Sequence, residues 1–268
     1  MKISLLSHKS PEKNEIEDAF YVSPNQKTFG VFDGVTPLTP DLFKGGHNGA
    51  YLASHHLAGT LESAEDGENL AEWLISANDS LMRVMNEAGI SVDDRHLRWA
   101  SCAAVIRITG NRLEFVQCGD CMIAAENRDG NVRILTEDSV KGISDRARLY
   151  REKARNLGAA VPPESFYDEN PVERMKSHRS LANRPEGYSV ANGDKEFREY
   201  IQTGEIDLTS VTRIFLMSDG LFHPEWSLEE VCKEAFMYGL ENYAEALRYK
   251  EHTLGHRHDD MTGIIIER

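Results

Sequence analysis

Carboxylates occur at five places in the chain where a short apolar run begins or ends. These places are Glu17/Asp18, Asp33, Asp120, Asp219 and Asp259/Asp260. Oxygen ligands in this number suit Mg²⁺ or Mn²⁺ and do not suit zinc. Because neighbouring carboxylates cannot all ionise without a compensating cation, the pattern predicts a divalent-metal centre at a point where several strand ends converge.

The stretch Val31-Phe32-Asp33-Gly34 shows the pattern most clearly. An apolar run ends at Asp33-Gly34, so a buried strand would carry the Asp33 carboxylate to the rim of a sheet. A lone Asp-Gly pair is typical of an ordinary turn, but the same pattern recurs at Asp219-Gly220. The glycine leaves the Gly34 carbonyl free to approach a metal. A carboxylate that bridges two ions about 3.5–4 Å apart is suited to activating water against a phosphoryl group.

Short strands and amphipathic helices must position these carboxylates. Strands are predicted before residue 8 and at residues 19–23, 28–33, 99–109, 112–118, 122–126, 132–135, 214–218 and 261–266. Helices are predicted at residues 41–61, 70–88, about 140–157, 227–239 and 242–253, and residues 159–195 are expected to be loop. Short turns at Gly110-Asn111 and Gly119-Asp120 predict antiparallel neighbours. The expected fold class is therefore α+β, with antiparallel sheet and helices packed outside it.

Length and composition favour a globular chain. Of the 268 residues 40% are hydrophobic and 28% are charged, and no Pro/Gly/Ser-rich linker divides them. No apolar run has the length of a signal peptide or a membrane span, and four cysteines do not suggest a disulfide scaffold. The net charge of −14 argues against general nucleic-acid binding. We expect a cytoplasmic protein that binds neither nucleic acid nor membrane.

Five motifs in fixed order give the chain a family resemblance. They are Glu17-Asp18-Ala19, Val31-Phe32-Asp33-Gly34, Cys118-Gly119-Asp120, Met217-Ser218-Asp219-Gly220 and Asp259-Asp260-Met261-Thr262. Together they resemble the metal-dependent protein phosphatases of the PPM group, the type 2C serine/threonine phosphatases, in a compact bacterial-like form. The resemblance implies an α-β-β-α sandwich of two antiparallel sheets flanked by helices, built as one domain over residues 1–268. It places a variable flap region within about residues 139–210.

The resemblance also implies a role for each motif residue. Asp33 would bridge two Mn²⁺ or Mg²⁺ ions, Gly34 would ligate one ion through its carbonyl, and a metal-activated water would attack phosphoserine or phosphothreonine directly. The expected metal ligands are Asp33, Gly34, Asp219 and Asp259, with Glu17 and Asp18 holding metal-bound waters and Asp120 supporting a third ion. The expected catalytic residues are Lys13, Asp33 and Asp120, and Lys13 takes the place of the family's phosphate-binding arginine.

Two positions depart from the family pattern. Lys13 offers phosphate a point charge without the bidentate fork of arginine. Val35 stands where eukaryotic members place a histidine proposed as general acid, and the sequence does not identify a replacement.

Residues 141–184 hold ten Lys/Arg against six Asp/Glu, a net charge of +4. This basic excess predicts either a surface for a phosphorylated, acidic substrate, the product of a serine/threonine kinase in a signalling pathway, or a solvated helix face.

Other readings of the same residues stay open. A catalytically silent phosphatase-like module would bind a partner or sense a ligand. A phosphatase of the haloacid-dehalogenase type would need a nucleophilic aspartate at position 31, which is valine. The spacing Cys118-x-x-Cys121 matches redox and zinc sites but lacks a second pair, so we interpret it as incidental. The cluster His252, His256 and His258 is interpreted as polar surface, with proton transfer or metal binding as the alternative.

Overall fold

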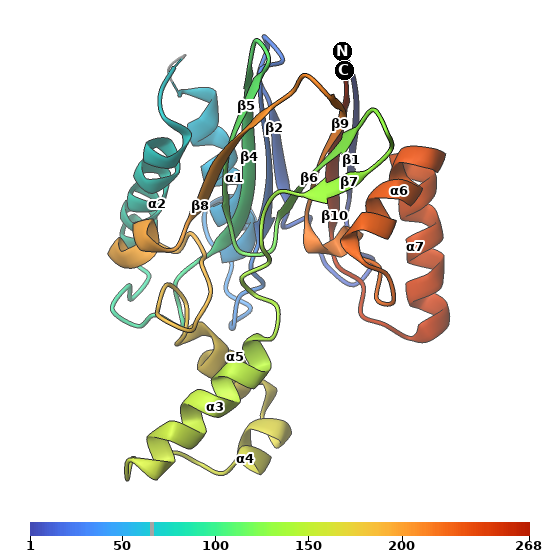
Figure 1. Ribbon diagram of the computed structural model, residues 1–268. Coiled ribbons are helices and arrows are strands. Elements are labelled where there is room, and N and C mark those ends of the chain that lie inside the picture. The colour runs from blue at the N-terminus through green and yellow to red at the C-terminus, as the bar shows by residue number, and fades with distance from the viewer. Residues whose placement is uncertain (65–66) are drawn as a thin grey trace.

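The computed structural model describes residues 1–64 and 67–268, and its strands form two antiparallel sheets packed face to face (Figure 1). One sheet has the order β1-β10-β9-β6-β7 and the other has the order β2-β3-β4-β5-β8. The strands are β1 (Lys2–His8), β2 (Ala19–Val22), β3 (Thr28–Gly34), β4 (Ser101–Thr109), β5 (Arg112–Cys118), β6 (Met122–Asn127), β7 (Val132–Ile134), β8 (Gln202–Asp207), β9 (Val211–Met217) and β10 (Met261–Glu267). The helices are η1 (Lys44–Gly46), α1 (Gly49–Glu62), α2 (Leu70–Glu87), α3 (Ile143–Asn156), α4 (Glu164–Glu169), α5 (Pro171–Arg179), η2 (Lys195–Glu199), η3 (Asp219–Leu221), α6 (Leu228–Tyr238) and α7 (Leu240–Leu254).

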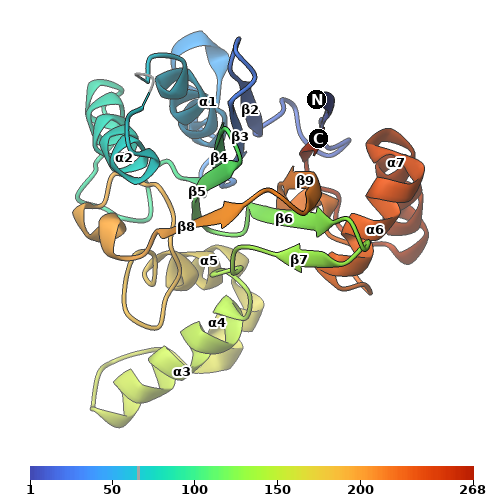
Figure 2. The ribbon, with the colours of Figure 1, turned by 45° about the horizontal axis from the view of Figure 1, so that its top comes forward.

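Helices cover the outer face of each sheet, so the sandwich has four layers (Figure 2). Helices α1 and α2 pack on the β2-β3-β4-β5-β8 sheet through a cluster that includes Phe32, Leu57 and Trp73. Helices α6 and α7 pack on the other sheet. A third apolar cluster, which includes Val31 and Leu216, fills the space between the sheets. The predicted α+β sandwich with flanking helices is therefore confirmed.

The carboxylate motifs share one edge of the sandwich because antiparallel strands reverse direction at each step. The C-terminal end of β3 pairs with the start of β4, where Asp33 lies opposite Cys102. In the other sheet, the end of β9 pairs with both β10 and β6, at Gly263 and Met122 opposite Met217. Acids that precede β2 and β10 therefore lie at the same edge as acids that end β3 and follow β9.

Side-chain alternation along β3 sets the direction of Asp33. Val31 belongs to the cluster between the sheets, whereas Phe32 contacts the cluster under α1 and α2. Since successive side chains of a strand point to opposite faces, Asp33 points to the same side as Val31, into the gap between the sheets. The strand thus delivers the carboxylate to the open edge of the sandwich.

Several predicted elements were wrong in extent or pairing. The helix expected at 41–61 begins at Gly49, where the Asn48 side chain accepts from the Tyr51 backbone N–H. Strand β8 was not predicted, and residues 159–195 contain α4 and α5 instead of loop alone. Strands β5 and β6 are joined by a tight turn but lie in different sheets. Helix 70–88 and the Ser227/Glu230 capping box of α6 are confirmed.

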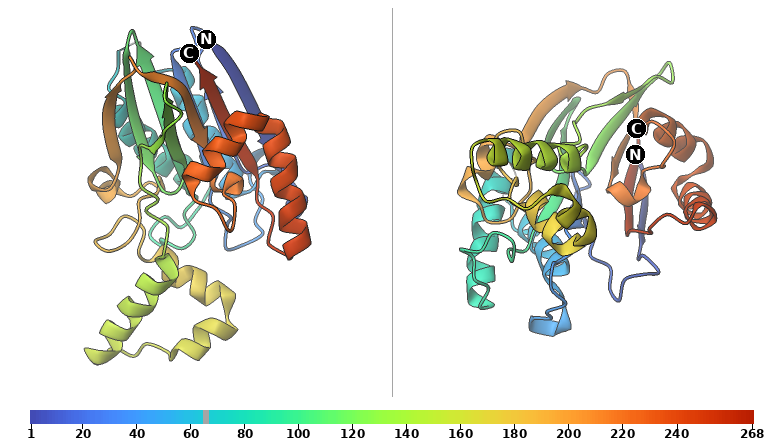
Figure 3. Two further views of the ribbon diagram at one scale, coloured as in Figure 1. Left: turned by 45° about the vertical axis from the view of Figure 1, so that its right-hand side comes forward. Right: turned by 90° about the horizontal axis from the view of Figure 1, so that it is seen from below.

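Helices α3, α4 and α5 project from the sandwich at the end opposite both termini (Figure 3). We call these helices and their connections, residues 143–179, the flap. Its apolar side chains are poorly covered: Leu149, Tyr150 and Leu157 of the α3 region are 51%, 54% and 88% exposed. The flap falls within the variable region predicted at about 139–210, whose bounds stay a prediction. In the described part of the chain, no helix has the length and apolarity to cross a membrane.

Candidate active site

A cavity of about 230 Å³ opens between the sandwich edge and the flap. Five of the predicted site residues line it: Asp33, Gly34, Asp120, Asp219 and Asp259. They come from the end of β3, the β5–β6 turn, the start of η3 and the segment before β10. Residues far apart in the sequence are thus brought to one surface, as the strand-end pattern predicted.

Glu17 and Asp18 lie buried beside this cavity, with 3% and 2% exposure. The Asp18 carboxylate accepts a hydrogen bond from Ser218 Oγ at 2.8 Å. The Glu17 carboxylate accepts from Asn48 Nδ2 at 2.7 Å and from Thr36 Oγ1 at 3.2 Å. Both acids therefore have fixed orientations that depend on the loop after β3, helix α1 and the end of β9.

The buried carboxyls raise one another's pKa. Burial raises the pKa of Asp18 to about 8, and the charges of Asp260 and Asp219 contribute further. Burial, with the charges of Asp18 and Asp219 among others, raises the pKa of Asp33 well above its ordinary range. Burial is also the main cause that raises the pKa of Asp120 to about 8 and the pKa of Asp219 to about 6. The fold therefore gathers acids whose charged forms it only partly compensates.

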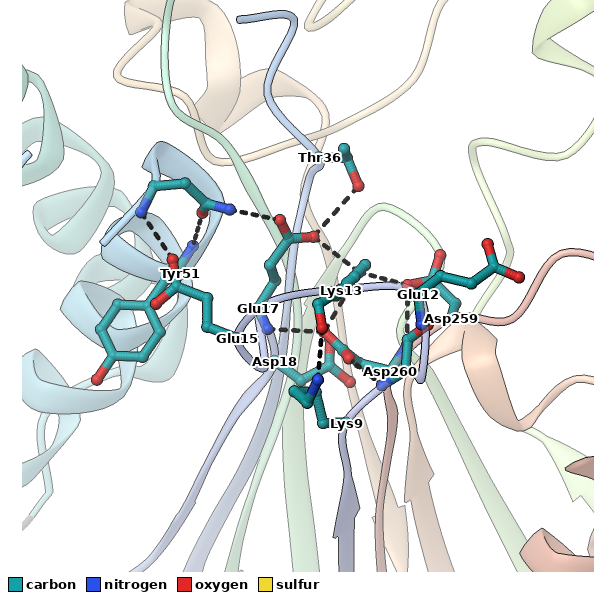
Figure 4. Close-up of polar contacts among 12 residues, drawn as sticks. Lys9, Glu12, Lys13, Glu15, Glu17, Asp18, Thr36, Tyr51, Asp259 and Asp260 are labelled. Atoms are coloured by element: carbon teal, nitrogen blue, oxygen red, sulfur yellow. Dashed lines mark hydrogen bonds and ion pairs between the residues drawn. The ribbon is translucent and has the colours of Figure 1, made fainter. Parts of the chain in front are cut away.

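The Lys13 ammonium lies among the carboxylates beside the cavity (Figure 4). The sequence predicted that this ammonium would instead contact the phosphate of the substrate. The ammonium lies 2.5 Å from Asp259 Oδ1, 2.7 Å from Glu17 Oε2 and 3.2 Å from Asp260 Oδ2, and the lysine side chain is 11% exposed. Burial opposes the charge of Lys13, but attraction to Asp259 and its hydrogen bonds to Asp259 and Glu17 outweigh that cost, so the pKa of Lys13 is raised.

Close backbone packing fixes Gly34 beneath the cavity. A Cβ at position 34 would lie 2.5 Å from the carbonyl oxygens of both Ala50 and Glu17, closer than any side-chain carbon can approach. Glycine is therefore required here by space, which also holds the residue after Asp33 in one place. Gly220 is packed in the same way, since its Cβ would meet the Asp260 carbonyl oxygen.

The donor set fits hard divalent cations. Four aspartates, Asp33, Asp120, Asp219 and Asp259, line the cavity, and carboxylate oxygens are the ligands that Mg²⁺ and Mn²⁺ prefer. As the side chains stand, no three His, Cys, Asp or Glu residues of the described chain are arranged to hold an ion. The Lys13 ammonium pairs with the Asp259 and Glu17 carboxylates, and Asn48 Nδ2 donates to Glu17, so the fit of this site to a divalent ion rests on its oxygen donors.

The sequence predicted a flap region but named none of its residues as part of the site. Met175, His178 and Arg179 of α5 line the cavity, together with Val35 and Thr36. Arg179 donates to the Thr36 carbonyl at 2.6 Å and to the His96 carbonyl at 2.7 Å. The basic excess of residues 141–184 was a signal for Arg179, but neither charge nor periodicity distinguished His178.

Within residues 1–64 and 67–268, neither the Cys118-x-x-Cys121 motif nor the cluster of His252, His256 and His258 belongs to a group of three His, Cys, Asp or Glu arranged to hold a metal ion. Cys118 and Cys121 are buried free thiols, and burial raises the pKa of Cys118 to about 12. His258 Nδ1 lies 3.0 Å from Glu12 Oε1, and its ring is 6.4 Å from that of His252. Position 31, where a haloacid-dehalogenase nucleophile would stand, is a valine buried between the sheets.

Comparison with known proteins gives one family and one fold. A family model described as protein phosphatase 2C matches residues 12–254, whereas no curated protein matches the chain. The serine/threonine phosphatase Stp1 from Staphylococcus aureus is 15% identical, with a TM-score of 0.62 over 100% of this chain and 94% of its own. PstP/Ppp from Mycobacterium tuberculosis is 18% identical, with a TM-score of 0.61 over 99% and 97%. The PstP catalytic domain was also solved with two manganese ions. At these identities the structures show a shared fold.

Proposed function

Because the chain belongs to the protein phosphatase 2C family and is a protein serine/threonine phosphatase, we propose that it dephosphorylates phosphoserine and phosphothreonine at a centre of two Mn²⁺ or Mg²⁺ ions. The observation that carries the proposal is the single cavity lined by Asp33, Asp120, Asp219 and Asp259. Buried acids with raised pKa values are costly unless a cation or a function compensates them. Two divalent ions would provide that compensation.

Each predicted residue has a place in this proposal. Asp33, the carbonyl oxygen of Gly34, Asp219 and Asp259 would hold the two ions, with Asp33 contributing to both. Glu17 and Asp18 would orient water, and Asp120 would support a third ion. When bound, the ions supply the Lewis acidity that makes water a nucleophile at neutral pH and offsets the charge of the phosphoryl group.

The chain's own residues then bind and orient the substrate. Lys13 offers the phosphate a compact positive charge on a flexible stem, with less directional control than arginine. Val35 lines the cavity but has no proton to donate to the leaving serine or threonine oxygen. The flap faces the same opening through α5, and the net charge of +4 at residues 141–184 favours an acidic phosphoprotein, the product of a serine/threonine kinase. A cytoplasmic signalling role belongs to the same proposal.

An activity assay on four proteins tests the proposal. Wild type should hydrolyse phosphoserine and phosphothreonine peptides in Mn²⁺ or Mg²⁺ and lose this activity in EDTA. Asp33→Asn and Asp219→Asn should abolish the Mn²⁺-stimulated hydrolysis because each removes an ion ligand. Asp129→Asn, which changes an exposed acid in the β6–β7 turn, should keep it. Full activity in both site variants would overturn the proposal, and an aspartyl-phosphate trapped on the protein would overturn direct attack by water.

A further inference from the structure

Lys13 belongs to a loop that is held firmly at both ends. The Asp260 carboxylate, 1% exposed, accepts from the backbone N–H of Ser10 at 2.7 Å and from that of Glu17 at 2.6 Å. Glu12 lies 3.0 Å from the ring of His258 on the far side of the loop. The backbone around Lys13 is therefore fixed on the segment before β10 that carries Asp259 and Asp260, and the freedom that remains is in the lysine side chain.

The Lys13 side chain uses that freedom to reach inward. Its ammonium contacts three carboxylates, those of Asp259, Glu17 and Asp260, and does not project into solvent (Figure 4). Of the three, Asp260 is already satisfied by two backbone donors. Asp259 is the most exposed, at 35% of its side chain, and it also lines the cavity. The ammonium therefore sits between a buried structural acid and an acid that faces the substrate side.

One ammonium against three carboxylates leaves two negative charges uncompensated. A divalent cation is attracted to this uncompensated negative charge, but an ion that binds Asp259 also lies close to the Lys13 ammonium. Two cations a few ångströms apart repel by several times the thermal energy, even at an effective dielectric constant of about 20. The divalent ion and the Lys13 ammonium therefore cannot both contact the Asp259 carboxylate without strong repulsion. Of the two cations, the ammonium is the one that can move, because it stands on a flexible side chain.

We propose that the Lys13 ammonium is a displaceable internal cation of the metal centre, which occupies Asp259 and Glu17 until a divalent ion binds at Asp259 and drives it toward the cavity. The inference rests on the proposed function, because it takes Asp259 as a metal ligand. The displaced ammonium is then free to contact the phosphate of a substrate. Metal loading and phosphate binding are thereby coupled through one side chain, and the coupling is reciprocal: phosphate that holds Lys13 strengthens metal binding.

Mn²⁺ binding to two charge-matched variants tests the displacement. Lys13→Gln removes the internal cation, whereas Lys27→Gln removes the same charge from an exposed position at the β2–β3 turn. Mn²⁺ affinity is read by calorimetry and by electron paramagnetic resonance of free Mn²⁺. Lys13→Gln should bind its weakest-held ion about tenfold more tightly than wild type or better, and Lys27→Gln should match wild type. Turnover of a phosphopeptide should nevertheless fall in Lys13→Gln, because its phosphate contact is lost.

A labelling experiment on wild type keeps the inference testable if Lys13→Gln does not fold. In EDTA, an amine-reactive reagent followed by peptide mass spectrometry should label Lys13 far more slowly than Lys27. Saturating Mn²⁺ should raise the Lys13 rate at least about fivefold and leave Lys27 unchanged, since displacement is what exposes the amine.

The outcomes separate this inference from the proposed function. Wild type that binds Mn²⁺, with equal or weaker binding by Lys13→Gln, overturns displacement and leaves the metal centre intact. Lys13 labelling that does not change with Mn²⁺ also overturns displacement. If neither wild type nor Lys13→Gln binds Mn²⁺, the proposed function and the inference built on it both fail.

Discussion

Asp18→Asn should stabilise the metal-free protein, although it removes a residue proposed for the active site. Asp18 is 2% exposed, and burial with its acidic neighbours raises its pKa from 3.8 to about 8. At pH 7 the folded protein therefore takes up a proton at Asp18 that the unfolded chain does not carry. Asparagine has the shape of the protonated carboxyl, and its amide oxygen can still accept from Ser218 Oγ.

The magnitude follows from the difference between the pKa and the working pH. Each pKa unit corresponds to about 1.4 kcal/mol, so raising the pKa of Asp18 from 3.8 to about 8 costs roughly 4 kcal/mol at pH 7. Proton sharing with Asp33 and Asp219 reduces this amount, because one proton relieves several acids. We expect the free energy of unfolding of Asp18→Asn in EDTA to exceed that of wild type by about 2–4 kcal/mol.

The pH dependence has a definite sign. A carboxyl with a raised folded-state pKa binds more protons in the folded protein than in the unfolded chain, so stability falls as pH rises between its two pKa values. Wild type in EDTA should therefore lose stability from about pH 5 to pH 8, the range over which Asp18 and Asp120 keep a proton in the folded protein that they lack in the unfolded chain. Asp18→Asn should show a shallower decline. Excess Mn²⁺ should reverse the order of stability, because wild type then gains the energy of ion binding.

Urea unfolding followed by circular dichroism, at pH 5 to 8 with EDTA or Mn²⁺, measures all three effects. Asp129→Asn serves as control, since it removes an equal charge from an exposed turn. Stability of Asp18→Asn equal to or below that of wild type in EDTA at pH 7 would refute the electrostatic account. Wild-type stability that rises from pH 5 to pH 8 in EDTA would do the same.

Three further changes test the fold around the site. Gly34→Ala places a Cβ 2.5 Å from the carbonyl oxygens of Ala50 and Glu17, so unfolding in urea should show a loss of more than about 2 kcal/mol; a loss within error would mean that the backbone yields. Arg179→Ala removes the donors to Thr36 and His96, so limited proteolysis should cut the flap faster while Mn²⁺ binding is kept; an unchanged cutting rate contradicts this anchoring role. The four buried thiols should not react with a thiol reagent until urea unfolds the chain, and rapid labelling of the native protein would reopen the redox reading of Cys118 and Cys121.

The convergence of the carboxylates was predictable because it follows from a local rule. Each acid precedes or follows a short apolar run, and antiparallel pairing places such positions at one edge of a sheet. Asp33 lies at the end of β3, Asp219 follows the end of β9, and both line the same cavity. Asp33 and Asp219 belong to different sheets, so their convergence also required the two sheets to pack face to face.

The structure of the flap was predicted poorly because the apolar pattern of its sequence does not match the burial of its side chains. The apolar stripe of α3 predicts a helix, which forms, but Tyr150 on that stripe remains 54% exposed because the flap has few neighbours to pack against. Residues 159–195 were expected to be loop, yet Pro171 stands at the first position of α5, where its missing N–H has no cost. Short helices of this kind depend on their contacts more than on propensity.

The change of sheet between β5 and β6 was also invisible in the sequence. Gly119-Asp120 has the composition of a hairpin turn, but the turn carries the chain across the sandwich. Gly119 has a φ of +80°, and a Cβ there would meet the Cys102 side chain. Glycine is therefore required at position 119 because of its close contact with β4. This contact cannot be predicted from the sequence pattern, which shows only that a glycine is present.

Val35 and His178 together limit how the leaving oxygen can gain its proton. Val35 has none to give, and His178 is the imidazole among the residues that line the cavity. Burial, with the charges of Arg151 and Arg174, lowers the pKa of His178, so it is mostly uncharged at neutral pH. A general acid must hold its proton at the working pH. Val35 and His178 are therefore both poor sources of the proton that the leaving serine or threonine oxygen needs at neutral pH.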